Sequence, residues 1–301
     1  EKQGLLALLI YTNFSNAAIF DYIKLYYYIK KNKIDIAIGT NYKINIVLSF
    51  CRCKTIGTEH VAYEKYKKWQ TALKKLFYKN LTYLVTLTKI DYERYAKWNN
   101  LNVIHIPNFI YLEQPFLQRN RRVRNFLAVG RLVEQKGFDL LIEALNIVAK
   151  SKHDFTCRII GEGEDKESLQ AKIHKYDLDE NITIKDFMIH ERLADEYKQA
   201  DCFLLSSRHE GMPFVLLEAL SFSLPVIAFD CPTGPSEIIE SGKDGYLVEH
   251  NNYLKFAQQI ISLMNLNESE ILLMSKNAYE KSKQYSSTTV LNKWKSLLGE
   301  I

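Results

Sequence analysis

The sequence predicts an α/β protein built from two doubly wound parallel sheets, and three observations support this class. Short β-branched runs alternate with amphipathic helical stretches, as in strands joined by βαβ crossovers. The alternation breaks once, near residues 107–125, and then restarts. A chain of 301 residues that is 47% apolar and 25% charged is typical of one large or two medium globular domains.

The first half is expected to hold an alternation of strands and helices of its own. We expect strands over Ile34–Gly39, Lys54–Thr58, Tyr83–Leu87 and Val103–Ile106, and helices over Ala17–Lys31, Tyr66–Lys79 and Ile90–Trp98. Pro107, Pro115 and the polar basic tract Gln118–Asn125 then predict an interdomain linker. We therefore place the first domain at residues 1–118 and the second at 119–285.

The second half repeats the pattern. We expect strands over Phe126–Val129, Thr156–Ile160, Ile182–Lys185, Cys202–Leu205, Pro225–Ala228 and Tyr246–Val248, and helices over Asp139–Lys150, Asp165–Tyr176, Glu191–Ala200 and Phe214–Phe222, with two helical segments after them. Ligands of doubly wound sheets bind at the carboxyl ends of the strands. The loops at those ends are therefore where we look for chemistry.

Charge is distributed unevenly between the halves. Residues 1–118 carry 17 Lys and Arg against 8 Asp and Glu, whereas residues 119–301 carry 23 against 27. The densest basic stretch, Glu64–Lys79, interleaves lysines with aromatic and apolar residues at helical spacing. Two interpretations stay open: a solvated helix face above a core stripe, and a surface for anionic lipid headgroups. No helix-turn-helix, RNA-binding or zinc-finger pattern accompanies the charge, which disfavours nucleic acid.

The five cysteines are scattered and odd in number, which predicts a reducing, cytoplasmic environment. They form no CxxC pair, and Cys51 and Cys53 have no nearby ligands to complete a metal site. We therefore expect no metal. No apolar run approaches the ~20 residues of a membrane-spanning helix.

The loop after Phe126–Val129 is the first candidate for a ligand site. It begins at Gly130, which permits close backbone approach, and it carries Arg131 and Lys136. An arginine fork and a lysine point charge at this spacing can converge on one diphosphate. Two exposed loop cations are the alternative.

The segment after Cys202–Leu205 is the stronger candidate. Pro213 suits the first turn of a helix, so the unpaired amides of about Phe214, Val215 and Leu216 are expected to face an anion. Glu210 precedes this helix, and Glu218 lies within its apolar run, where an unpaired carboxylate is costly. We expect a ligand hydroxyl to be the partner of Glu218, although a solvent-facing position is the alternative.

Two further patterns are weaker. Gly161 and Gly163 follow a strand, but Lys166 stands where the dinucleotide fingerprint needs a third glycine. This disfavours a nicotinamide-dependent oxidoreductase. His60 follows the strand Lys54–Thr58, where a loop should face the ligand, but a lone histidine is more often structural.

Taken together, these motifs resemble one enzyme family. The ordered segments are G-R-L-x-x-x-K-G from Gly130, I-I-G-E-G, E-G-M-P-F-V-L-L-E-A-L from Glu210, P-V-I-A, G-P-S-E-I-I and G-x-x-G-Y-L-V. They are similar to those of the GT-B glycosyltransferases of family 4, the retaining group 1 enzymes, in particular those of bacterial surface-glycan synthesis. The resemblance is strong over residues 126–250 and weak over 34–110, where Gly57–His60 and Ile106–Asn108 carry it.

The resemblance implies two Rossmann-like domains facing a cleft, with the final helix, 286–301, returning to the first domain. The first domain is the acceptor side, and the second binds the nucleotide-sugar donor. The first domain is expected to lack one or two initial βα units, so that the chain is truncated at its start.

The resemblance also implies roles for individual residues. Gly130, Arg131 and Lys136 hold the diphosphate, and Glu218 binds the ribose hydroxyls. The catalytic positions are Glu210 and His60, of which His60 reaches the sugar from the first domain. The remaining donor-binding residues are Met188, which borders the base, the sugar-contacting stretch Gly211, Met212, Pro213 and Phe214, and the helix-start residues Val215 and Leu216.

The implied reaction is retaining transfer of a hexose or N-acetylhexosamine from a nucleotide sugar, with UDP expected, and without a metal. The expected acceptor is a lipid-linked or lipopolysaccharide-type glycan. The basic first half suggests peripheral binding to an anionic membrane surface at the inner face of the plasma membrane. The alternative is a non-catalytic nucleotide-sugar-binding module or an inactive fragment of such an enzyme.

Overall fold

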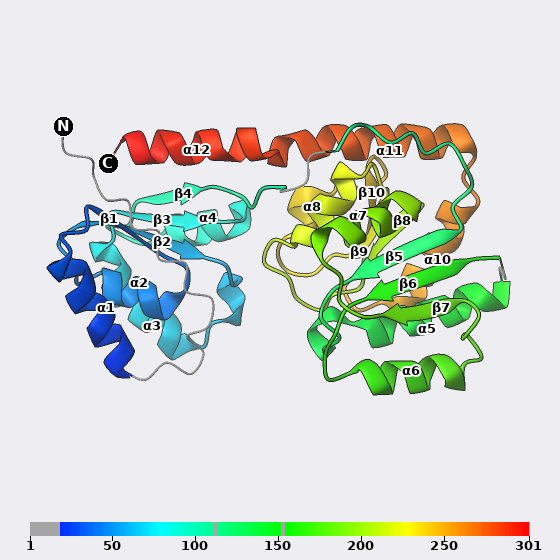
Figure 1. The fold of residues 1–301 in the computed structure, drawn as a ribbon, viewed down its shortest axis with the longest axis horizontal. Coiled ribbons are helices and arrows are strands. Elements are labelled where there is room, and N and C mark those ends of the chain that lie inside the picture. Colours follow the sequence, from blue (N-terminus) through cyan, green and yellow to red (C-terminus); the bar gives the residue numbers. More distant parts are fainter. Residues whose placement is uncertain (1–18, 111–113, 152–153, 301) are drawn as a thin grey trace. The chain divides into compact units, whose positions relative to one another are not determined.

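The computed structural model of the chain describes residues 19–110, 114–151 and 154–300 (Figure 1). These residues form two compact units. The first ends at Pro107 and includes the residues from Asn292 onward, and the second is Asn108–Leu291. Each unit is described by itself.

The first unit contains a four-stranded parallel sheet in the order β1-β2-β3-β4. Its strands are β1 (Ile36–Gly39), β2 (Lys54–Glu59), β3 (Tyr83–Thr86) and β4 (Val103–His105). Its helices are α1 (Ile19–Lys31), α2 (Tyr42–Leu48), α3 (Lys68–Phe77) and α4 (Lys89–Ala96), with short 3-10 turns at Tyr63–Lys65 and Tyr78–Asn80. The helix α12 (Ser287–Gly299) starts in the second unit and ends in this one.

The second unit contains a six-stranded parallel sheet. Its strands are β5 (Asn125–Val129), β6 (Thr156–Ile160), β7 (Ile182–Lys185), β8 (Cys202–Leu205), β9 (Val226–Phe229) and β10 (Gly245–Val248). Its helices are α5 (Phe138–Ser151), α6 (Lys166–Lys175), α7 (His190–Gln199), α8 (Phe214–Ser221), α9 (Pro235–Ile238), α10 (Tyr253–Met264) and α11 (Glu268–Ser282), with 3-10 turns at Glu134–Lys136 and Lys283–Tyr285.

The strand order of this sheet, β10-β9-β8-β5-β6-β7, locates its ligand-binding edge. The chain runs outward from β5 through β6 to β7, returns to β8 beside β5, and then runs outward in the opposite direction. Such a reversal splays the loops that follow the two central strands and opens a crevice at their carboxyl ends. The loops after β5 and β8 are the two that the sequence singles out.

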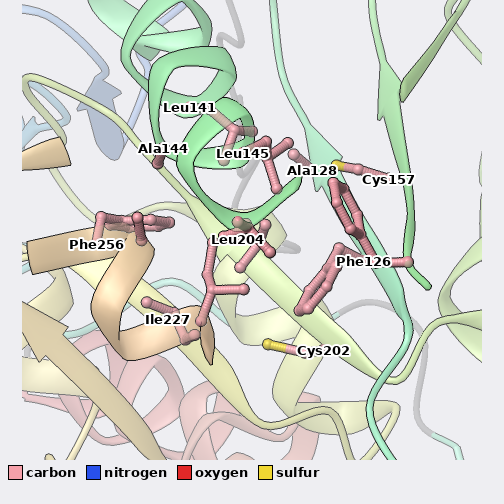
Figure 2. Packing of buried hydrophobic residues seen from close by; sticks show 14 of the residues in the cluster. Phe126, Ala128, Leu141, Ala144, Leu145, Cys157, Cys202, Leu204, Ile227 and Phe256 are labelled. Carbon is pink, nitrogen blue, oxygen red and sulfur yellow. The ribbon is translucent and has the colours of Figure 1, made fainter. Parts of the chain in front are cut away.

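The core of the second unit buries one face of its sheet against α5 and α10. Phe126, Ala128 and Leu204 of the sheet pack against Leu141 and Leu145 of α5 (Figure 2). Phe256 of α10 joins the same cluster. These side chains are at most 1% exposed, and each large one stabilises the fold by roughly 1.5–3 kcal/mol through its burial. The rigid sheet fixes where the loops begin.

The structure confirms every expected strand to within about two residues, but it differs in the helices. Helix α2 was not expected, because Ile44, Ile46 and Val47 are β-branched. It forms because the side chain of Asn41 caps the amides of Lys43 and Ile44. Three helices rather than two follow the last long helix–strand alternation, namely α10, α11 and α12.

The predicted linker named Pro107, Pro115 and the tract 118–125, and the units divide at Pro107. The prediction is wrong for 118–125, because this tract is held to the second unit. Arg119 is buried and donates to the carbonyls of Tyr197 (3.0 Å) and Phe222 (3.0 Å), and also contacts the carbonyl of Ala200. The unit boundary lies at 107/108 instead of 118/119, since the amide of Leu117 already donates to Ser223 Oγ at 3.0 Å. The other boundary lies at 291/292 instead of 285/286.

Among the described residues, the helices are all too short or too polar to cross a lipid bilayer.

Candidate active site

The loops after β5 and β8 meet through a lysine and a glutamate. Lys136 Nζ lies 2.7 Å from Glu210 Oε1, and the hydroxyl of Ser207 donates to the same oxygen at 2.5 Å. The two side chains are only 15% and 7% exposed. The Glu210 carboxylate thus accepts from two donors, and the Lys136 ammonium, with three N–H groups, retains capacity for further acceptors. The structure thus brings together two of the predicted site residues.

Backbone and arginine contacts lock these two loops to one another. Arg208 forms a two-pronged ion pair with Asp139, with both N–O distances at 2.7 Å, and its amide donates to the carbonyl of Gln135 at 2.8 Å. Gly137 adopts a left-handed conformation with φ of 64°, and a Cβ there would lie 2.0 Å from the carbonyl oxygen of Ser206. Only glycine allows this close approach.

The two other predicted residues of the first loop lie beside this pair. Gly130 directly follows β5, and its amide donates to the carbonyl of Ile160 at 3.0 Å. A Cβ at Gly130 would touch the stem of Lys136 at 3.3 Å. Arg131 follows with an exposed side chain. The loop therefore offers one cation that is fixed and one that is accessible.

Helix α8 starts at this same edge, with Pro213 as its N-cap rather than in its first turn. The amide of Leu216 donates to the carbonyl of Pro213 at 3.2 Å, so the prediction of an unpaired amide at Leu216 is wrong. Within the described part of the chain, the amides of Phe214 and Val215 have no hydrogen-bond acceptor. These two N–H groups carry the positive end of the helix dipole, which favours an anion.

The turn that precedes α8 is held from both sides. Asn108 Nδ2 donates to the carbonyl of Met212 at 2.9 Å, and the Asn108 amide donates to Met212 Sδ at 3.3 Å. Gly234, with φ of 94°, approaches the other side so closely that a Cβ would lie 2.4 Å from the carbonyl oxygen of Gly211. The hydroxyl of Thr233 donates to the carbonyl of Glu210 at 2.5 Å. Glu210, Gly211 and Met212 are therefore preorganised.

Glu218 does not need a ligand to satisfy its charge. It is buried, and its Oε2 accepts from the hydroxyl of Tyr197 at 2.9 Å. Tyr197 stacks on Phe222 at 5.0 Å between ring centroids. Burial, and then the Glu218 charge, raise the pKa of Tyr197 well above its usual value. The sequence argument missed this tyrosine because it lies on α7, 21 positions away.

Met188 lies half-buried in the loop between β7 and α7. Its neighbours Phe187 and Ile189 are 68% and 59% exposed, which is unusual for large apolar side chains. This loop follows β7 at the same carboxyl edge of the sheet as the loops after β5 and β8.

His60 lies in the first unit, directly after β2. Its Nε2 is 3.0 Å from Thr58 Oγ1. Desolvation lowers the pKa of His60 below its usual value, and the adjacent Glu59 carboxylate opposes that shift. The imidazole is thus biased toward its neutral form at physiological pH.

A second lysine–glutamate pair includes Glu59, the residue before His60, and the sequence did not predict this pair. Glu59 Oε1 is 3.2 Å from Lys74 Nζ, and both side chains are at most 1% exposed. The hydroxyls of Tyr66 and Tyr78 donate to Glu59 at 2.6 and 2.5 Å. Lys74 also donates to the hydroxyl of Tyr95, and burial lowers the pKa of Lys74 to about 8 against the opposing charge of Glu59. The helical spacing of the stretch Glu64–Lys79 suggested that Lys74 belongs to a basic surface. The structure shows instead that Lys74 is buried.

Among the residues that the structure describes, no three His, Cys, Asp or Glu side chains are grouped as metal ligands would be. The five cysteines are free, with Cys51 and Cys53 half-buried and the others buried.

Comparison with known proteins places the chain in a family. The profile of the glycosyl transferases group 1 matches residues 113–281. The amylovoran biosynthesis glycosyltransferase AmsD of Erwinia amylovora is 31% identical over 258 residues, which cover 82% of this chain and 71% of that protein. The poly(ribitol-phosphate) alpha-N-acetylglucosaminyltransferase of Staphylococcus aureus is 30% identical over 201 residues, covering 66% of this chain but 40% of the relative.

The fold is shared with solved glycosyltransferase structures. That of Anabaena HepE in complex with UDP superposes with a TM-score of 0.80 at 15% identity, over 93% of this chain and 82% of that one. The two parallel sheets match the GT-B architecture. The chain belongs to the glycosyl transferases of group 1, a family of transferase enzymes with the GT-B fold.

Proposed function

We propose that this chain transfers a hexose or N-acetylhexosamine, with retention, from a UDP-sugar to a glycan or lipid-linked acceptor of a bacterial surface polysaccharide. Family membership supports the transfer reaction. The names of two relatives, one acting in amylovoran biosynthesis and one transferring α-N-acetylglucosamine to poly(ribitol phosphate), support the acceptor class and the sugar. UDP in the HepE structure supports the nucleotide.

The observation that carries the proposal is the cluster of positive groups at the carboxyl edge of β5 and β8. Lys136 uses one of its three N–H groups on Glu210, and the amides of Phe214 and Val215 lack acceptors among the described residues. Arg131 is exposed on the same loop as Lys136. Together these groups can bind a diphosphate through hydrogen bonds and charge, without a metal ion.

The same groups stabilise the charge that develops during transfer. Breaking the bond between the anomeric carbon and the phosphate oxygen leaves negative charge on the diphosphate and oxocarbenium character on the sugar. Lys136, Arg131 and the start of α8 stabilise the diphosphate. Glu210, a buried carboxylate held by Lys136 and Ser207, stabilises the positive sugar. For retention, the acceptor hydroxyl attacks from the face that the diphosphate leaves, and a departing phosphate oxygen accepts its proton.

The remaining residues are proposed to position the donor. Gly130 leaves room for the diphosphate beside Lys136, and Gly211, Met212 and Pro213 present the turn before α8 to the sugar. Glu218, held by Tyr197, accepts hydrogen bonds from the ribose. The loop with Met188 borders the base. In the first unit, His60 acts on the sugar.

We also propose that helix α3 binds an anionic lipid surface, because it exposes both apolar and basic side chains. Trp69 and Leu76 are 56% and 54% exposed, so the helix does not simply turn an apolar stripe toward the core. The lysines that remain exposed around them are Lys65, Lys67, Lys68, Lys75 and Lys79. Such a face binds headgroups through its lysines and the acyl boundary through its aromatic and leucine side chains. Cytoplasmic location at the inner membrane face follows from this proposal.

Binding of UDP and UDP-sugars, measured by calorimetry, tests the donor site. We expect Lys136→Met to weaken UDP binding by about tenfold or more, since a charge-assisted hydrogen bond contributes ~1.5–3 kcal/mol. The matched control is Lys150→Met, an exposed lysine at the end of α5. Equal affinities for the two variants would contradict the diphosphate assignment.

Transfer of radiolabelled sugar to a membrane-glycan fraction separates an enzyme from a binding module. Glu210→Gln is expected to abolish transfer while UDP binding is kept, because this change removes the charge that stabilises the sugar but leaves the phosphate contacts. Binding without transfer by the wild-type chain would support the non-catalytic alternative. Transfer unaffected by Glu210→Gln would remove Glu210 from the catalytic positions.

Cosedimentation with vesicles tests the membrane proposal. We expect binding to vesicles that contain anionic lipid, weaker binding at high salt, and loss of binding for Lys67→Glu combined with Lys75→Glu. Equal binding to purely zwitterionic vesicles would exclude the charge-based mechanism.

A further inference from the structure

A hydrogen-bonded chain at the carboxyl end of β2 is not explained by the proposed roles. Thr58 Oγ1 lies 2.8 Å from the carbonyl oxygen of Gly39 on β1 and 3.0 Å from His60 Nε2. Thr58 is 4% exposed, so water does not compete freely for its hydroxyl. The three groups therefore form an ordered series from backbone to imidazole.

The direction of these hydrogen bonds follows from the chemistry of the groups. A carbonyl oxygen can only accept, so the single hydroxyl proton of Thr58 is donated to Gly39. What remains at Thr58 Oγ1 is a lone pair, and the group that faces it must be a donor. His60 Nε2 therefore carries a proton, and in the neutral imidazole Nδ1 carries none.

The backbone on both sides of this series is held. The carbonyl of Thr58 accepts from Asn45 Nδ2 at 3.1 Å, and the next residue is the buried Glu59 with its two tyrosine donors. Desolvation lowers the pKa of His60, and the Glu59 carboxylate opposes this shift. The charge of Glu59 is partly offset by Lys74, whose Nζ lies 3.2 Å from Glu59 Oε1. His60 itself is exposed, so its ring is oriented by the contact with Thr58 Oγ1.

We propose that Thr58 is a positioning residue that fixes His60 in the Nε2–H tautomer, so that Nδ1 is presented as a hydrogen-bond acceptor for a hydroxyl of the sugar substrate. The inference rests on the proposed function, in which His60 acts on the sugar. It assigns His60 an accepting rather than a donating contact. Substrates that lack the hydroxyl, or that replace it by an acceptor such as fluorine, bind or react more weakly.

The tautomer is measured directly by NMR of the full chain labelled with ¹⁵N-histidine. The signal of His60 is identified by its loss in His60→Gln. We expect the Nε2–H form in the wild-type chain, a mixture of tautomers in Thr58→Val, and the wild-type form in Thr58→Ser, which keeps the hydroxyl. An Nδ1–H form in the wild-type chain overturns the proposal, whether or not any variant folds.

A matched control and a kinetic measurement separate positioning from stability. Thr86 is also a buried strand threonine, and its hydroxyl donates to the carbonyl of Thr88 at 3.2 Å. Thr86→Val is expected to leave the His60 tautomer and transfer unchanged. Thr58→Val is expected to lower kcat about tenfold, as for one lost hydrogen bond, with UDP affinity unchanged and kcat restored in Thr58→Ser.

The two proposals fail differently. No transfer by the wild-type chain overturns the proposed function and the substrate half of this inference, while the NMR measurement still decides the role of Thr58. Normal transfer with the same His60 tautomer in the wild-type chain and in folded Thr58→Val overturns only the role of Thr58.

Discussion

The two units each hold a lysine paired with a glutamate, but the surroundings of the pairs differ. Glu59 and Lys74 are enclosed by Tyr66, Tyr78 and Tyr95, and no part of the pair reaches solvent beyond 1% of either side chain. Glu210 and Lys136 are 7% and 15% exposed, at loops that follow two central strands. The two pairs have the same residue types, so residue type alone does not distinguish a structural ion pair from a candidate ligand site. The difference lies in the N–H groups near each pair that are still able to donate hydrogen bonds.

Breaking the pair of Glu59 and Lys74, called here the enclosed pair, should give the largest effect on stability. Lys74→Met keeps most of the volume but leaves the Glu59 charge buried without its cation, so we expect a loss of about 3–5 kcal/mol in unfolding free energy. Urea denaturation followed by tryptophan fluorescence measures this, since Trp69, Trp98 and Trp294 all belong to the first unit. Lys75→Met, an exposed neighbour on α3, is the control. A double variant that adds Glu59→Gln should recover much of the loss.

Arg119 is a buried cation of a different kind from Lys74, because its guanidinium donates to backbone carbonyls and not to a carboxylate. Its replacement by alanine leaves the carbonyls of Tyr197, Ala200 and Phe222 without these donors, and we expect a loss of about 2–3 kcal/mol in the second unit. Hydrogen exchange of amides in α7 and β8 measures it, with the exposed Arg122→Ala as control. Equal protection in both variants would mean that water replaces the guanidinium at no cost.

The enclosed pair also predicts a pH dependence for the first unit. With the pKa of Lys74 lowered to about 8, the unfolded chain binds this proton more tightly than the folded one. Stability of the first unit should therefore rise with pH between about 8 and 10, by ~1.4 kcal/mol per pH unit at most. Lys74→Met should remove the rise. Equal slopes in the wild-type chain and in Lys74→Met would show that Lys74 keeps its proton in the folded state.

The pair of Lys136 and Glu210, called here the open pair, should matter least for stability. Lys136→Met is expected to cost about 1–2 kcal/mol in the second unit, less than Lys74→Met, because the hydroxyl of Ser207 still donates to Glu210. Thermal unfolding followed by circular dichroism measures the change against Lys150→Met. A loss as large as that of Lys74→Met would make the open pair a structural element and weaken the case for a ligand site.

Much of the fold was predictable because strand and helix periods are local properties. The alternation identified every described strand, and amphipathic spacing identified most helices. Helix α2 was missed because its β-branched residues contradict a helix locally, and the burial of Ile44 and Leu48 decides otherwise. The tract around Arg119 was misjudged because its partners lie 78 to 103 positions away.

For the candidate site, the order of the motifs predicted that the loops after β5 and β8 form it. The hydrogen bonds within and between these loops could not be predicted. Lys136 and Glu210 were expected at one ligand, and the structure adds that they contact each other. Tyr197 and Lys74 left no signal in the sequence, because each acts through a partner on another element. Thr58 and Glu59 stood inside the Gly57–His60 segment, but the sequence did not assign them a role. Free amides at Phe214 and Val215 followed from Pro213, whereas the bond from Leu216 depends on where the helix starts.

The contact between Asn108 and Met212 has a mechanical consequence. Asn108 is the first residue of the second unit, and it grips the turn before α8 through two hydrogen bonds. The turn that begins α8 is thus fixed to the first residue of its own unit, 104 positions earlier in the chain. A single asparagine side chain therefore sets where that turn lies within the second unit.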